Sequence, residues 1–224
     1  MEQELKSEGI CIFCNEIISQ QHQTKHLAEH LAVVEKEQKN AETGSWHIKV
    51  EAGEMFLQLL VDGNVTFKAL DKYLRDIWVE CCGHMSAFRH RNMKISMKNT
   101  LDEVCSPRLK IDYEYDFGDT TYLEVSINKR YAIKTPEKIK LLSRNNPLKL
   151  MCAICKKKPA EIICPICMYE ENALFCNSCS EIHEKECSDF GEDTQLPVVN
   201  SPRMGVCGYG GGIIDKDRDG VYKK

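Results

Sequence analysis

Residues 151–187 read MCAICKKKPAEIICPICMYEENALFCNSCSEIHEKEC. Eight side chains of this stretch are of the metal-binding kind and come in paired steps: Cys152, Cys155, Cys164, Cys167, Cys176, Cys179, His183 and Cys187. A C-x2-C pair turns tightly and can place both sulfurs on one tetrahedral ion, about 2.3 Å from zinc. Eight ligands make two complete sets of four, and such sets are structural rather than catalytic. Because the stretch has few apolar residues, we expect each metal ion to supply folding energy, about 10 kcal/mol or more.

Ligand pairs in such modules often alternate between two ions, which predicts an interleaved cross-brace. One predicted zinc ion is bound by Cys152, Cys155, Cys176 and Cys179, and the other by Cys164, Cys167, His183 and Cys187. A sequential pairing and two iron–sulfur clusters are the alternatives, and an imidazole among the thiolates disfavours the clusters. The stretch resembles B-box and MYND-type zinc fingers, and its closing H-x3-C is nearer to MYND. The spacing leaves the choice between these two open.

Composition and charge limit the compartment in which the protein can work and the kinds of partner that it can have. The chain has 224 residues, thirteen cysteines and a formal net charge of −4. No apolar run approaches the roughly 20 residues that span a bilayer, and the acidic N-terminus carries no secretory signal. We therefore expect reduced, metal-binding thiols in a cytoplasmic protein without membrane attachment.

The two cysteine-rich parts are acidic. Residues 1–45 carry four Lys and Arg against eight Asp and Glu, and residues 150–224 carry nine against twelve. A phosphate backbone is bound by dense basic patches, which are absent from these parts.

A third set of ligands lies near the N-terminus: Cys11, Cys14, His26 and His30. Positions i and i+4 share one face of a helix, so both imidazoles can reach one ion from the predicted helix TKHLAEHLAVVEKEQKN. The set resembles a two-Cys, two-His zinc finger and predicts a third zinc ion. His22 is a rival ligand whose spacing from Cys14 is tight.

This finger-like set departs from the usual pattern in two places. The interval between its ligand pairs is one residue short, and Gln23 stands where a core leucine is expected. The small core of the module is therefore expected to come from Ile12, Ile17, Ile18 and Leu27.

Residues 46–149 are predicted to form an α+β domain with an antiparallel sheet. SWHIKVEA (45–52) and EMFLQLLV (54–61) read as a first hairpin. LKIDYEYDFG (109–118) and TTYLEVSIN (120–128) read as a second, with alternating apolar and polar residues. The expected fold class is thus an α+β core decorated by two small zinc-binding modules.

Helical and returning segments lie between the two hairpins. Thr66 is the predicted N-cap of the helix FKALDKYLRDIWVE (67–80), whose apolar residues line one face. SAFRHRNMKIS (86–96) is predicted to return as one strand. A polar linker, SRNNPLK (143–149), leads into the cysteine-rich stretch.

Three motifs resemble the plasmid Ri "ORF-three"-like family, also called transposon-passenger TnpR-like. YEYDFGDTTYLEVSI (113–127) resembles its signature hairpin Y-D-F-G-D-x-W, with Tyr122 in place of the tryptophan. WVECCGHMSAF (78–88) stands where the family has G-W-x-x-x-H-L-H-x-F, and LPVVNSPRMGVCGY (196–209) resembles the family's ending. The residues that match are His84, Phe88, Tyr115, Asp116, Phe117, Gly118, Asp119, Asn200, Pro202 and Arg203.

This resemblance covers residues 46–134 and 195–209. It implies a compact α+β domain whose activity is not established and whose link to mobile elements is genomic neighbourhood. The chain shows no serine-recombinase active site. The expected organisation is a finger-like module and helix (1–45), the core (46–149), the double-zinc module (150–190), and a segment (191–224) that returns to the core and ends in a flexible tail.

The remaining candidate sites are interpreted as structural. Cys81, Cys82 and His84 suggest a thiol nucleophile with a base, but they end an apolar helix, where cysteine is usually a small buried side chain. Cys105 and Cys207 have no C-x2-C partner and are interpreted as packing residues. Asp116 and Asp119 flank a hairpin turn, where aspartate more often forms the turn than a catalytic dyad.

Two functional hypotheses follow, and neither is an enzyme. The first is a zinc-binding interaction module or adaptor with protein partners. The second is a nucleic-acid-binding accessory protein of a mobile element, supported by two basic groups of residues: Arg89, His90, Arg91 and Lys94 on one predicted strand, and Lys156, Lys157 and Lys158 on a zinc knuckle. The sequence predicts three zinc ions and leaves the oligomeric state open.

Overall fold

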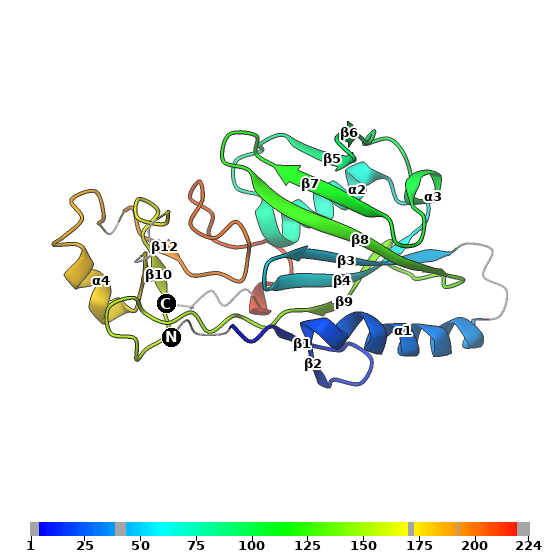
Figure 1. The fold of residues 1–224 in the computed structure, drawn as a ribbon, viewed down its shortest axis with the longest axis horizontal. Coiled ribbons are helices and arrows are strands. Elements are labelled where there is room, and N and C mark those ends of the chain that lie inside the picture. Colours follow the sequence, from blue (N-terminus) through cyan, green and yellow to red (C-terminus); the bar gives the residue numbers. More distant parts are fainter. Residues whose placement is uncertain (1–4, 39–43, 170–172, 192, 219–224) are drawn as a thin grey trace. The chain divides into compact units, whose positions relative to one another are not determined.

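The computed structural model describes residues 5–38, 44–169, 173–191 and 193–218 (Figure 1). The chain divides into two compact units. The sheet unit comprises Ser7–Leu74 and His84–Asn146. The cysteine unit comprises Met1–Lys6, Arg75–Gly83 and Pro147–Lys224.

The sheet unit is built on a seven-stranded antiparallel sheet of order β6-β5-β7-β8-β3-β4-β9 (Figure 1). The strands are β3 (Ser45–Ala52), β4 (Met55–Asp62), β5 (Ser86–His90), β6 (Met93–Lys94), β7 (Lys110–Tyr115), β8 (Thr121–Tyr131) and β9 (Ile139–Arg144). The helices are α1 (Gln20–Glu37), α2 (Phe67–Leu74) and α3 (Leu101–Val104). This mixture of helices and antiparallel strands confirms the predicted α+β class.

Both predicted hairpins are present, β3 with β4 and β7 with β8. Ala52 pairs with Met55 across a two-residue turn in which Gly53 has a φ of +56°. Glycine adopts this left-handed backbone at little cost because it has no Cβ. In β4 every residue from Met55 to Val61 is buried, and all of these except Gln58 are apolar.

Aromatic rings join α2 to strands β5 and β7. Phe67 lies edge-on to Phe88, with 5.0 Å between ring centroids, and Phe88 lies 4.7 Å from Tyr113. The Tyr113 hydroxyl donates a hydrogen bond to the Asp71 carboxylate of α2 at 2.8 Å. These contacts give the sheet unit an ordinary apolar core with a satisfied polar group at its edge.

The N-terminal segment belongs to the sheet unit and packs against the sheet. Strands β1 (Glu8–Ile10) and β2 (Ile17–Ser19) pair as a short hairpin before α1. Leu27 and Leu31 of α1 are fully buried. They belong to a cluster with Cys11, Leu60, Tyr131, Ile133 and Leu142. The helix therefore buries its apolar stripe against the sheet.

The expected core of this segment is wrong in part. Ile12 and Ile17 are 46% and 59% exposed, because the sheet fills the place that they were expected to fill. Gln23, found where a leucine was expected, is fully buried. Its Nε2 donates to the carbonyls of Gly9 at 2.7 Å and Ile18 at 2.9 Å, which ties α1 to both strands of the hairpin.

Two other segments differ from the sequence-based expectation. Residues 86–96 form two strands rather than one, because Arg91 and Asn92 have positive φ angles of 49° and 66° and reverse the chain. Paired left-handed residues are typical of two-residue hairpin turns. The predicted linker begins inside β9, where Ser143 and Arg144 are buried.

The cysteine unit has little regular structure. Strands β10 (Ile162–Ile163), β11 (Leu174–Phe175) and β12 (Leu196–Pro197) form a small antiparallel sheet of order β11-β10-β12. Its helices are η1 (Arg75–Val79, π-helical), α4 (Asn177–His183) and η2 (Lys216–Arg218, 3-10). One group of buried residues in this unit is small and aliphatic: Ala160, Ile163, Ala173 and Val198.

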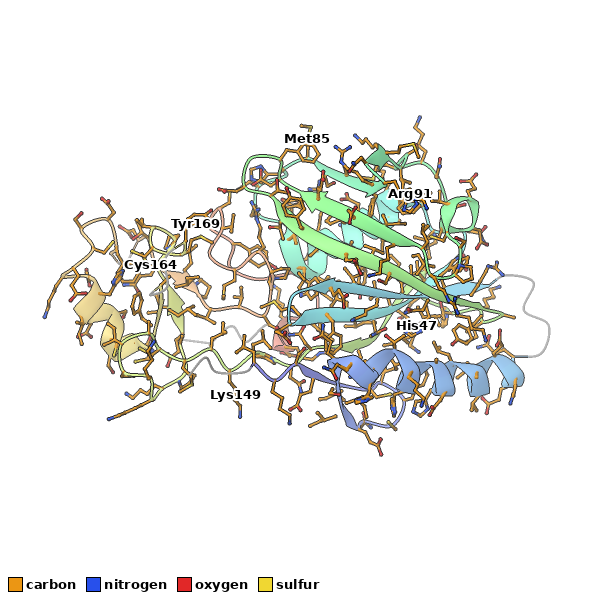
Figure 2. All side chains as sticks on the ribbon, viewed as in Figure 1. His47, Met85, Arg91, Lys149, Cys164 and Tyr169 are labelled. Carbon is orange, nitrogen blue, oxygen red and sulfur yellow. The ribbon has the colours of Figure 1, made fainter. Side chains whose placement is uncertain are left out.

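A buried histidine makes the stability of the sheet unit depend on pH. His47 lies on β3 and is labelled in Figure 2; its Nε2 pairs with Gln58 Oε1 at 2.8 Å. Gln58 in turn donates to the hydroxyl of Thr24 on α1 at 2.9 Å. Burial lowers the pKa of His47 from 6.5 to about 4, and the bond to Gln58 opposes this only in part.

We predict that acidification destabilises the sheet unit through His47. Between pH 6.5 and 4 the unfolded chain binds a proton that the folded chain does not, so stability falls as pH falls through this window. The difference amounts to about 3 kcal/mol at most. Urea unfolding across this range should show that the free energy of unfolding falls more steeply with pH in the wild type than in His47→Gln. Any loss of metal at low pH affects both proteins equally and does not change this difference. Equal pH dependence of the two proteins would contradict the assignment.

Candidate metal centres

The structure brings Cys11, Cys14, His26 and His30 together, with one ligand atom from each and all four atoms within 4.8 Å of one another. The cysteines lie on the turn between β1 and β2, and the histidines lie one helical turn apart on α1. Cys14 Sγ is 3.3 Å from His26 Nε2. His22, the rival ligand, instead pairs through Nδ1 with the Ser19 hydroxyl at 2.9 Å.

A second group consists of Cys152, Cys155, Cys176 and Cys179, again within 4.8 Å of one another. Cys176 is the N-cap of α4, and Cys179 lies in the first turn of that helix. Burial raises the pKa of Cys152, but backbone N–H groups of Cys155, Cys176 and Ile154 outweigh it and bring the pKa to about 6. Donors aimed at a sulfur favour the thiolate, which is the form that binds metal.

The third group is Cys164, Cys167, His183 and Cys187, with the same closeness of ligand atoms. His183 is 8% exposed and stacks on Phe175 at 4.2 Å between ring centroids. Its Nε2 is buried and accepts or donates no hydrogen bond among the described residues. A buried polar atom without a partner is costly, and a metal ion would satisfy it.

The four pairs of ligands are therefore interleaved, the first pair with the third and the second with the fourth. This is the cross-brace arrangement, and a sequential pairing is not what the structure brings together. Cys164 is labelled in Figure 2. In an interleaved pairing, each metal ion joins ligands from both halves of the stretch.

The donor chemistry of these groups fits zinc. Burial, together with the thiols beside it, raises the pKa of Cys167 to about 12, and the same causes raise that of Cys179 to about 12. Crowded thiols resist ionisation because their charges repel, and a divalent cation reverses this. Sets of four Cys and His ligands, with no carboxylate, are typical of tetrahedral structural zinc.

The structure also gathers cysteines that the sequence did not predict to be ligands. Cys81, Cys82 and Cys207 of the cysteine unit have their sulfurs within 4.8 Å of one another. Cys82 and Cys207 are exposed, so the interpretation of these residues as buried packing cysteines is wrong. Cys82 and Cys207 are 125 positions apart and follow no C-x2-C spacing, so no local pattern pointed to them. Cys105 behaves as expected: burial raises its pKa to about 12.

The family-motif residues of the sheet unit mostly serve its fold. Phe88 and Tyr115 are buried in the core, whereas Phe117 is 46% exposed and Asp119 is exposed. Asp116 has a φ of 65°, and its Oδ1 accepts the N–H of Gly118 at 3.0 Å. The same oxygen lies 3.6 Å from His84 Nδ1. The aspartate thus forms the hairpin turn, as interpreted from the sequence.

In the cysteine unit, the motif residues organise the segment after β12. Asn200 donates from Nδ2 to the carbonyl of Arg218 at 3.0 Å. The N–H of Arg203 donates to the Ser201 hydroxyl at 2.9 Å, and the Arg203 side chain is fully buried. Pro202, between them, is half-buried.

No family model matches the chain, and no curated protein matches it. Among solved structures, the chain is similar to a protein of unknown function from Methanosarcina mazei Go1, with 19% identity and a TM-score of 0.39. The similarity covers 45% of this chain and 67% of that chain. It is too low to support an argument, so kinship with the plasmid Ri family stays a prediction. Within the described ranges, no helix has the length and apolar character to cross a bilayer.

We predict that Cys164→Ser lowers the zinc content of the purified protein by at least one ion per chain. The substitution removes a buried thiolate, and a hydroxyl is a poor zinc ligand. The control is Cys105→Ser, because Cys105 belongs to none of the ligand groups among the described residues. Mass spectrometry of metals gives the count and identifies the metal. Wild-type zinc content in Cys164→Ser, or iron in place of zinc, would contradict the assignment.

Proposed function

We propose that this protein is a non-enzymatic zinc protein that binds other proteins, working in a reducing compartment such as the cytoplasm. The observation that carries the proposal is the closure of the three predicted ligand groups, each with four protein ligands. A catalytic zinc ion keeps one position open for water or substrate, and a structural ion does not. In this proposal the metal ions stabilise the fold, and the surface of the folded protein binds the partner proteins.

The finger-like segment supports a scaffolding role over DNA reading. Its helix α1 buries Leu27 and Leu31 against the sheet. Glu35 of α1 accepts the N–H of Ala132 at 2.6 Å. A finger that reads DNA lays its helix in the major groove with basic and amide side chains outward. Here the helix is committed to the sheet and carries acidic residues, such as Glu29, on its other positions.

A cavity in the cysteine unit offers a place for a partner's side chain. The cavity is open to solvent and has a volume of about 610 Å³; Cys167, His183 and Cys187 of the third ligand group line it, together with Ile154, Phe175 and Glu186. Ile154 is 42% exposed, and Tyr169, labelled in Figure 2, is 73% exposed. Of these two, Ile154 lines the cavity, and exposed apolar side chains at a concave surface are typical of protein interfaces.

The second candidate is nucleic-acid binding, favoured by the β5–β6 hairpin. Arg91 lies at its turn, is exposed and is labelled in Figure 2. Lys94 on β6 is also exposed. Arg89 is less available to bind a phosphate group, because its guanidinium pairs with the Glu114 carboxylate at 2.9 Å. The basic group is thus smaller than the sequence indicated.

Two measurements separate these candidates. Fluorescence titration of the full-length zinc-loaded protein with random duplex and single-stranded DNA should show no dissociation constant tighter than about a micromolar. Affinity capture of the tagged protein from nuclease-treated cells should recover partners that are lost in Ile154→Asp, because a buried charge opposes docking. Val33→Asp is the matched control, since Val33 is 55% exposed on α1.

Salt-dependent DNA binding tighter than a micromolar would favour the second candidate instead. Identical partner profiles of the wild type and Ile154→Asp would remove the cavity from the proposal.

A further inference from the structure

Three thiols of the cysteine unit have the spacing of metal ligands. Sγ of Cys82 lies 3.6 Å from Sγ of Cys207, and Sγ of Cys81 lies within 4.8 Å of both. Sulfurs on a tetrahedral zinc ion at about 2.3 Å stand roughly 3.8 Å apart. The corresponding distance in the third ligand group, between Cys167 and Cys187, is 4.0 Å. The thiols are therefore as close as those of a predicted zinc site.

The backbone holds the two sides of this group together. Ser201 donates from its hydroxyl to the carbonyl of Trp78 at 2.5 Å, and Ile213 donates its N–H to the carbonyl of Asp76 at 2.7 Å. At Gly212, an added Cβ would lie 2.3 Å from the carbonyl of Ile77, so only glycine fits there. The segment with Cys207 is thus docked on η1, next to Cys81 and Cys82.

The conformation of Cys207 also points to a ligand role. Its φ is +51°, in a turn where Gly205 and Gly208 have φ angles of +82° and +68°. Left-handed backbone is unfavourable for a residue with a side chain, and strained residues of this kind gather at ligand sites. The turn therefore holds a cysteine at a position where glycine would adopt the same backbone angles without strain.

A buried arginine contacts this group. Arg203 is fully buried, and its Nη2 donates to Cys81 Sγ at 3.6 Å. Metal ligands are commonly held in place by a second hydrogen-bonding residue of this kind. Arg203 belongs to the motif shared with the plasmid Ri family, whereas the cysteines came to light only in the structure.

We propose that Cys81, Cys82 and Cys207 form a fourth zinc site. All three thiols belong to the cysteine unit, and together they supply three ligands to the ion. Zinc displaces the three thiol protons to solvent, and no oxidation or reduction is involved. The site fastens residues 201–213 to the end of η1.

This fourth site is more open to solvent than the two sites of residues 152–187. Cys82 and Cys207 are exposed, whereas Cys152, Cys164, Cys176 and Cys179 are buried. A chelator reaches an exposed ion first, so the fourth zinc ion leaves before the two ions of residues 152–187. The inference shares only zinc binding with the proposed function and does not depend on a partner.

The test is native mass spectrometry of the full-length protein, purified with reductant and zinc. The wild type should carry four zinc ions, Cys207→Ser three, and Cys105→Ser four. Titration with a zinc chelator should release the ion that Cys207→Ser lacks ahead of the two ions of residues 152–187.

Three zinc ions in the wild type would overturn the fourth site and leave the proposed function standing, whereas fewer than three would overturn both. Four ions in Cys207→Ser would also overturn it, and Cys82→Ser repeats the test if Cys207→Ser does not fold. A Cys82–Cys207 disulfide in wild-type protein that was purified with reductant and zinc would overturn the fourth site as well.

Discussion

Residues 152–187 of the cysteine unit depend on one physical constraint: two of their buried groups are built around thiols. One of these groups consists of Cys152, Cys176 and Cys179, with Cys155 packed against them. Another joins Cys164 to Phe175 and Phe190. Uncharged thiols in these positions bury little apolar surface, and thiolates repel one another. A divalent ion at the centre of each group neutralises the repulsion between thiolates. Its binding then stabilises the folded state by about 10 kcal/mol or more per structural site.

The sheet unit obeys a different rule. Its strands bury long apolar runs and aromatic rings, and α2 closes one face through Phe67, Phe88 and Tyr113. The N-terminal ligand group combines both kinds of stabilisation. Leu27 and Leu31 pack on the sheet, Gln23 ties the helix to its hairpin, and the ligand Cys11 is buried in the same cluster as the two leucines. The two units therefore respond differently to loss of metal.

Much of this architecture could be predicted because it is local in sequence. Alternating residues marked the hairpins of β3–β4 and β7–β8, and the C-x2-C steps marked the pairs that the structure gathers into ligand groups. The turn at Arg91 and Asn92 was not predicted, because neither residue is a glycine and the basic residues around them were interpreted as one continuous strand. Strand β9 was missed because polar residues at its end read as a linker.

What could not be predicted depends on contacts between distant parts of the chain. The exposure of Ile12 and Ile17 follows from α1 lying on the sheet, which no pattern within residues 1–45 records. The thiols of Cys82 and Cys207 come together across 125 positions, with no spacing rule that links them. Sequence periodicity predicts which face of an element is buried, but not which element covers it.

The central claim is that bound metal holds the cysteine unit folded. Hydrogen–deuterium exchange of the full-length protein, with zinc and after complete removal of zinc by a chelator under reducing conditions, tests it most directly. The account predicts that peptides within residues 150–187 lose their protection when zinc is removed, while peptides of β3, β4 and β8 keep theirs. Full protection of residues 150–187 in metal-free protein would contradict it.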